Sequence, residues 1–128
     1  MITRINDLEE ELVVEDAFPK LFRIAVPTLE GITFVSVEKI IFCKADSNYT
    51  ELIMTDHKKL LVAKSLKQFE RILMGSGFFR IHHNAIVNLS HIQKYVRGSG
   101  GYVVLTEGHH QDVSRRRKHS FLKTVDYL

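Results

Sequence analysis

Short apolar runs separated by turn residues dominate the sequence from Leu21 onward, and they constrain the fold more than any other feature. The runs are rich in Val, Ile, Leu and Phe, and most are bounded by Gly, Pro, Asp or Asn. This pattern predicts short antiparallel strands joined by tight turns. Strands are expected over residues 21–26, 32–37, 39–45, 49–55, 58–63 and 102–107, with shorter strands and turns over 78–96 and a hairpin tip at 98–101.

One mid-chain segment, residues 65–74, has helical spacing instead. Ser65 and Gln68 stand at the spacing of a capping box, and Gly75 follows the last apolar position. The apolar stripe of this expected helix consists of Leu66, Phe69, Ile72 and Leu73.

A second helix is expected at the C-terminus, after the N-cap residue Ser114. Its core-facing residues would be Val113, Phe121, Leu122 and Val125. Together with the strands, the two helices predict a mainly β domain with one helix in the middle and one at the end.

The N-terminal segment differs in composition from the rest of the chain. Residues 1–30 contain seven acidic and three basic residues, a net charge of −4, whereas residues 31–128 have a net charge of +7. Residues 3–15 read as a short helix that is too short to be stable alone, and Pro19 ends it. We therefore predict an acidic linker helix over 1–20 and a basic domain over 21–128.

Several function classes lack the residues that they need. No apolar run approaches the roughly 20 residues of a membrane-spanning helix, and the acidic start does not match a signal peptide. Cys43 is the only cysteine and lies in an apolar strand, which indicates a buried structural residue. These features predict a soluble cytoplasmic protein without a cofactor.

Catalysis has no support in the sequence. The adjacent histidine pairs at residues 82–83 and 109–110 are the only hint of a metal site. Neighbouring residues on a strand point to opposite faces, so one metal ion would rarely bind both members of a pair. No carboxylate cluster joins them, no Gly-rich loop opens a helix, and no nucleophile–base pair stands out. We therefore expect neither an enzyme nor a metal site.

The start of the C-terminal helix is unusual, because Arg115, Arg116, Arg117 and Lys118 follow Ser114 directly. A helix N-terminus already carries partial positive charge and favours anions. Four cations there make sense if a phosphate occupies the helix end. Alternatively, the arginines extend into solvent or pair with Glu107 or Asp112.

Three stretches carry a resemblance to a known family. The sequence "FFRIHHNAIVNLSHI" (78–92), preceded by "IIFCKADSNYTELI" (40–53) and followed by "VSRRRKHSFL" (113–122), resembles the LytTR DNA-binding domain. The resemblance covers about residues 21–125, and it implies that the acidic helix before them is the linker from a receiver domain absent here. It implies an elongated sandwich of short antiparallel sheets, whose projecting loops, rather than a recognition helix, reach into the grooves of DNA.

The resemblance also implies which residues contact DNA. Base-reading positions fall on Asn48 and Tyr49 in one loop, on His83 in a second, and on Arg115. Backbone contacts fall on Asn84, Arg116, Arg117 and Lys118. Two positions depart from the family's usual pattern: Lys44 stands where many relatives have Glu, and His83 stands where Arg or Asn is common.

The predicted function is therefore sequence-specific binding of double-stranded DNA by the output domain of a transcriptional response regulator. The expected partners are DNA, a second copy of the domain on repeated sites, and, in the full-length protein, a receiver domain and an upstream histidine kinase. One alternative is a basic β module that binds a protein or membrane partner. A single-strand binder would need aromatic residues displayed on a sheet, and the phenylalanines here instead follow core patterns.

Overall fold

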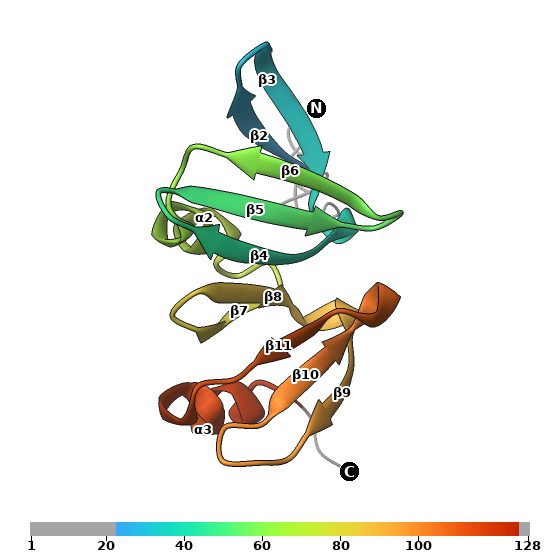
Figure 1. The fold of residues 1–128 in the computed structure, drawn as a ribbon, viewed down its shortest axis with the longest axis vertical. Helices are drawn as coiled ribbons and strands as arrows, with labels where there is room; N and C mark the ends of the chain where they lie inside the picture. The colour runs from blue at the N-terminus through green and yellow to red at the C-terminus, as the bar shows by residue number, and fades with distance from the viewer. Residues whose placement is uncertain (1–22, 126–128) are drawn as a thin grey trace, which may run out of the picture.

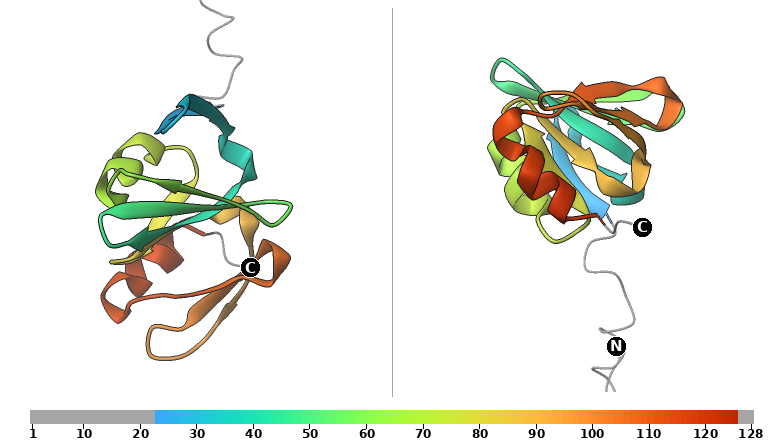
Figure 2. Two further views of the ribbon diagram at one scale, coloured as in Figure 1. Left: turned by 45° about the horizontal axis from the view of Figure 1, so that its top comes forward. Right: turned by 90° about the horizontal axis from the view of Figure 1, so that it is seen from below.

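The computed structural model describes residues 23–125, so the predicted acidic helix within residues 1–20 lies outside the described part. Three antiparallel sheets are stacked along the long axis of the molecule (Figure 1). The two α-helices of the described residues lie on the same side of this stack (Figures 1 and 2). The predicted fold class, a mainly β sandwich with a mid-chain and a C-terminal helix, is confirmed.

The first sheet is the predicted N-terminal hairpin, formed by β2 (Arg23–Thr28) and β3 (Gly31–Ser36). One face of the hairpin is buried through Ile24, Val26 and Val35. The other face leaves Phe34 59% exposed, with the guanidinium of Arg23 5.2 Å from the centre of its ring. The expectation that the phenylalanines follow core patterns is therefore wrong for Phe34, because it alternates with the buried Val35 along β3.

The second sheet has five strands in the order β6-β5-β4-β8-β7. Its central strand is buried on both faces, because an apolar cluster covers each of them. A register shift between Ile40 and Phe42 interrupts the strict alternation of its side chains. Ile40 and Cys43 consequently face one apolar cluster, while Ile41 and Phe42 face another. The strands are β4 (Ile40–Asp46), β5 (Tyr49–Met54), β6 (Lys58–Val62), β7 (Phe78–His82) and β8 (Ala85–Asn88).

The mid-chain helix α2 (Leu66–Leu73) packs on the first of these clusters. The predicted capping box is present: the backbone N–H of Gln68 donates to Ser65 Oγ, and that of Ser65 donates to the Gln68 side chain. Ile72, expected in the apolar stripe, is 51% exposed. It lies at the border of the stripe because Leu66, Phe69 and Leu73 occupy its centre.

The third sheet has the order β11-β10-β9, and α3 follows it. The sheet contributes Val103 and Leu105 to the second apolar cluster, which it shares with β4, β7 and β8, and α3 and the segment before it add Phe121 and Val113. The sequence did not predict β11, which is a three-residue edge strand without apolar alternation. The elements are β9 (Ile92–Val96), β10 (Tyr102–Leu105), β11 (His110–Asp112) and α3 (Arg115–Lys123).

Three short 3-10 helices complete the connections between described strands. They are η1 (Val37–Lys39), η2 (Leu89–His91) and η3 (Thr106–Gly108). Asn88 starts η2 by accepting from the N–H of Ser90, and its amide donates to Ile40 O across the sheet. No helix in residues 23–125 is long and apolar enough to cross a membrane.

Candidate nucleic-acid interface

Three segments that are far apart in the sequence meet at one end of the molecule: the β4–β5 turn, the β7–β8 turn and the start of α3. All three lie toward the left edge of Figure 1. The N–H of Ala45 donates to Asn84 O at 2.9 Å, which joins the first two. The N–H of Ser114 donates to Ile81 O at 2.9 Å, which joins the β7 strand to α3. The structure therefore brings together the predicted DNA-contacting loops. We call them the contact turns.

The β4–β5 turn projects its side chains into solvent. Asn48 is exposed, and Tyr49, the first residue of β5, is 45% exposed. Ser47 has a φ of 56°, the left-handed conformation that a two-residue hairpin turn commonly requires. Both predicted reading residues of this turn are thus accessible to a large partner.

The β7–β8 turn holds His83 and Asn84 between the paired residues His82 and Ala85. The N–H of Asn84 donates to His82 Nδ1 at 3.4 Å, so a neutral His82 carries its proton on Nε2. The rings of His82 and His83 lie with centroids 4.4 Å apart. The argument that this pair would point to opposite faces is wrong, because His83 lies in the turn and not on the strand.

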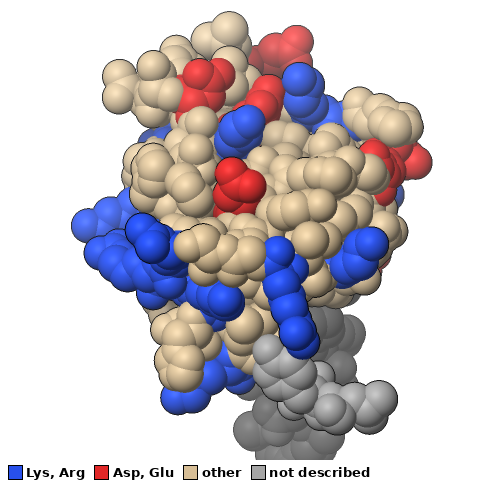
Figure 3. Space-filling model, turned by 60° about the horizontal axis from the view of Figure 1, so that its bottom comes forward, with Lys and Arg blue, Asp and Glu red and all other residues tan. Residues whose placement is uncertain are grey.

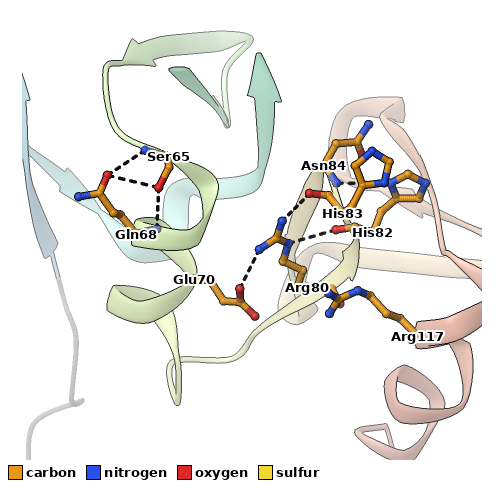
Figure 4. A network of polar contacts seen from close by, with 8 residues as sticks. All are labelled: Ser65, Gln68, Glu70, Arg80, His82, His83, Asn84 and Arg117. Atoms are coloured by element: carbon orange, nitrogen blue, oxygen red, sulfur yellow. Dashed lines mark hydrogen bonds and ion pairs between the residues drawn. The ribbon is translucent and has the colours of Figure 1, made fainter. Parts of the chain in front are cut away.

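Arg80 lies behind this turn and was not among the residues that the sequence singled out for the site. Its Nε donates to His82 O at 3.2 Å, and its Nη2 donates to His83 O. Its Nη1 donates to Glu70 Oε1 of α2 at 2.9 Å (Figure 4). A charged residue inside the apolar run "FFRIH" was the available signal, because a half-buried guanidinium needs partners.

The helix α3 begins as predicted, with Ser114 Oγ accepting from the N–H of Arg117 at 3.3 Å. The structure divides the four cations of its first turn. Arg115 and Arg116 are exposed, whereas Arg117 Nη1 donates to Arg80 O at 3.5 Å and Lys118 Nζ donates to Gly98 O at 3.2 Å. Arg115 and Arg116 are therefore the cations of this turn that face outward.

The β9–β10 hairpin tip positions the start of α3. The N–H of Val113 donates to Gly101 O at 2.9 Å. A Cβ atom at Gly100 would lie 1.9 Å from Val113 O, so only glycine fits at this close approach. Tyr95 Oη donates to Gly100 O at 2.6 Å and fixes the tip from the other side.

The charge on this side of the molecule is mostly positive. Figure 3 shows Lys and Arg side chains gathered on its left side, where Figure 1 draws the start of α3. Glu107, one suggested partner of the arginines, accepts instead from the N–H groups of Asp56 and His57 at 2.6 and 3.0 Å. No ion pair within residues 23–125 involves the four cations of the first turn of α3.

Two cavities border the contact turns. The smaller, about 220 Å³, is polar and lies between the second and third sheets, and the larger, about 370 Å³, lies beside α2 and β7. Lys44, His82, Asn84, His110, Gln111 and Asp112 line the smaller one. Lys44 therefore adds a cation beside the β7–β8 turn, although Asp112 brings a carboxylate to the same space.

Two side chains within residues 23–125 have perturbed acidity. Burial raises the pKa of Cys43 to about 12, so its thiol stays protonated and unreactive, in line with the predicted structural role. The N–H of Asp56 lowers the pKa of Glu107, and His57 adds to this effect. Among the described residues, no group of three or more His, Cys, Asp or Glu side chains is arranged to hold a metal ion.

A family model for the LytTr DNA-binding domain matches residues 30–126, which is most of the chain. The chain belongs to the LytTR family. The match contains all three contact turns, and this family is one of DNA-binding domains rather than enzymes. The family resemblance noted from the sequence is thereby confirmed.

A solved LytTR structure has the same fold. It is described as the LytTr DNA-binding domain of a methyl-accepting/DNA response regulator from Bacillus cereus. The two share 23% sequence identity with a TM-score of 0.72, and the match covers 84% of this chain and 99% of that one. No curated protein matches the chain.

Proposed function

We propose that this LytTR domain binds double-stranded DNA sequence-specifically, as the output domain of a transcriptional response regulator. The observation that carries the proposal is the meeting of the three contact turns at one end, with the exposed Arg115 and Arg116 among them. The description of the Bacillus cereus relative as part of a response regulator supports the wider context. A receiver domain and an upstream histidine kinase would complete that regulator.

Different residues of the contact turns are proposed to bind phosphates and bases. Arg116, Arg117 and Lys118, with Asn84, are proposed to bind the DNA backbone and set the register. Because the first-turn N–H groups of a helix lack intrahelical partners, a phosphate at the start of α3 would also receive backbone hydrogen bonds. Arg117 and Lys118 each donate to one protein carbonyl, and both retain further N–H donors for a phosphate.

Base reading is assigned to Asn48, Tyr49, His83 and Arg115. Arg115 is exposed at the helix start, where its guanidinium is free to offer two parallel donors to a guanine. Each ring nitrogen of His83 makes one hydrogen bond, as donor or acceptor. His83 therefore lacks the two-donor fork with which an arginine selects guanine, and its base preference is expected to differ from that of an arginine. Asn48 and Tyr49 would reach the groove from the neighbouring turn.

A selection from random duplexes tests this function. The selected duplex should bind about a thousandfold tighter than a scrambled duplex, and both affinities should fall steeply between about 50 and about 200 mM salt. Equal affinity for selected and scrambled duplexes would overturn the proposal. Preference for single strands, or for vesicles of anionic lipid over duplex DNA, would favour the other binding classes.

A further inference from the structure

The guanidinium of Arg80 makes three separate contacts from a single side chain. Two of its nitrogens donate to consecutive carbonyls, those of His82 and His83, and the third donates to Glu70. The Arg80 side chain is only 17% exposed. The planar guanidinium matches this arrangement because its donors point in fixed, diverging directions, which a lysine ammonium does not reproduce.

These contacts determine which way the β7–β8 turn faces. With the carbonyls of His82 and His83 directed at Arg80, the histidine rings lie on the far side of the turn (Figure 4). The remaining hydrogen bond inside the turn, from the N–H of Asn84 to His82 Nδ1, is long at 3.4 Å. Arg80 therefore holds the carbonyls of His82 and His83, while the N–H of Ala45 holds that of Asn84 at 2.9 Å.

Glu70 fixes the guanidinium from the opposite side. It lies on α2, whose capping box and buried residues Leu66, Phe69 and Leu73 anchor the helix on the sheet. The Glu70 carboxylate is 43% exposed, so solvent weakens its charge attraction to Arg80. Its main effect is to orient the guanidinium. Without it, one edge of the guanidinium has no partner to define its rotation.

The backbone of Arg80 also connects the turn to α3. Arg117 Nη1 donates to Arg80 O at 3.5 Å, and the next residue, Ile81, accepts from the N–H of Ser114 through its carbonyl. Arg80 thus lies between the β7–β8 turn and the helix start that carries Arg115. These contacts to α3 use backbone carbonyls, which a substitution of the Arg80 side chain leaves in place.

We propose that Arg80 is a positioning residue that sets the base preference of His83, with Glu70 of α2 holding it in place. Arg80 does not itself touch a base, because its donors are directed at the turn carbonyls and at Glu70. The inference rests on the proposed DNA-binding function of the same turn. It extends the determinants of specificity to α2, a helix outside the contact turns.

The first test is Arg80→Lys, which keeps the charge and removes the branched guanidinium. It should lower the preference for the selected duplex over a duplex changed at the His83 step by about fivefold to tenfold. Affinity for a scrambled duplex and the salt slope should stay unchanged, because the net charge is the same. Arg71→Lys is the matched control, since Arg71 is an exposed arginine of the same helix as Glu70.

A double-mutant cycle separates positioning from a general structural effect. In a His83→Gln background, Arg80→Lys should reduce affinity for the selected duplex by less than about twofold, because the residue through which it acts is gone. If instead the effects of the two substitutions multiply, Arg80 does not act through His83 and the inference is overturned.

Glu70→Gln is the second variant, in case Arg80→Lys fails to fold. It keeps an oxygen acceptor and should lower the preference at the same base step by a smaller factor. A DNA-independent readout is the backbone amide signals of His83 and Asn84 in a two-dimensional NMR spectrum. They should shift in Glu70→Gln and stay fixed in Arg71→Lys. Unshifted amides in Glu70→Gln would overturn the positioning role, whether or not the parent selects a DNA sequence. If the parent selects no DNA sequence, the proposed function is overturned instead.

Discussion

The second and third sheets are joined at both ends of the sandwich, but the two ends differ in how their backbone N–H groups and positive charges are paired. At the right end of Figure 1, Glu107 of η3 reaches the β5–β6 turn and accepts the N–H groups of Asp56 and His57. At the left end, Arg115 and Arg116 extend from a helix start whose first turn contains no acidic residue. The end with Glu107, here called the closed end, contains its own anion. The end with Arg115 and Arg116, here called the open end, presents donors and cations to an anion from outside.

The closed end shows what an internal anion achieves. Asp56, His57 and Glu107 all have positive φ values, of 64°, 57° and 65°, which non-glycine residues adopt at a cost of about 1 kcal/mol or more. The carboxylate offsets that cost by binding two consecutive N–H groups. The comparison teaches that an open helix start beside unpaired arginines is a feature of the contact turns and not of the fold in general.

The largest expected effect comes from removing an exposed arginine at the open end. Arg115→Ala should cost about 1–3 kcal/mol of binding free energy on the selected duplex and much less on a scrambled one, because a base contact contributes only where the base is right. Titrations of both duplexes at one salt concentration measure this. Equal losses on the two duplexes would make Arg115 a backbone contact.

The closed end is tested by Glu107→Gln, which keeps the shape and removes the charge. The variant should unfold at a lower temperature while DNA affinity stays that of the parent. Because the pKa of Glu107 is lowered in the folded state, its carboxylate stabilises the fold fully above about pH 4.5. This stabilisation is lost as the pH falls toward the lowered pKa. Thermal unfolding of parent and variant should converge on acidification, and a constant difference across this range would contradict the assignment.

The two helix starts can be compared through their N-caps. Ser65→Ala and Ser114→Ala should each lower the free energy of unfolding by about 1 kcal/mol. Only Ser114→Ala should also weaken DNA binding, since it disturbs the helix start within the contact turns. Denaturant unfolding and duplex titration of both variants check this, and equal effects on DNA would remove the distinction between α2 and α3.

The smallest effect in free energy concerns single phosphate contacts. Arg116→Ala should weaken binding to every duplex by a similar factor and reduce the salt slope by roughly one unit. The matched control is Lys58→Ala, an exposed cation near the closed end, which should leave the slope unchanged. A slope that responds equally to both changes would mean that bulk charge, and not position, drives binding.

Local signals explain what the sequence predicted well. The capping box of α2, the N-cap of α3 and the N-terminal hairpin each depend on residues a few positions apart, so their patterns are visible in the chain. The short edge strand β11 escaped prediction because its pairing with β10, and not its composition, makes it a strand. Ile72 was misplaced because the borders of an apolar stripe depend on what packs against it.

The parts of the site that were missed depend on contacts distant in sequence. Arg80 reaches Glu70 on another element, and Glu107 reaches a turn about fifty residues earlier. Neither pairing follows from spacing or propensity, since the first depends on how α2 packs beside β7 and the second on how the second and third sheets stack. The resemblance located the turns that carry the predicted contacts, whereas the residues that hold those turns in place required the structure.

The central strand β4 has a consequence for how the domain comes apart. Ile40 and Cys43 belong to one apolar cluster and Ile41 and Phe42 to the other, so this strand cannot leave one cluster without exposing the other. The two cores are therefore coupled into a single cooperative unit, even though they lie on opposite faces of the five-stranded sheet. Amide hydrogens of β4 should exchange with solvent only when the whole domain opens, which makes Cys43, the single thiol of the chain, a built-in reporter of global unfolding.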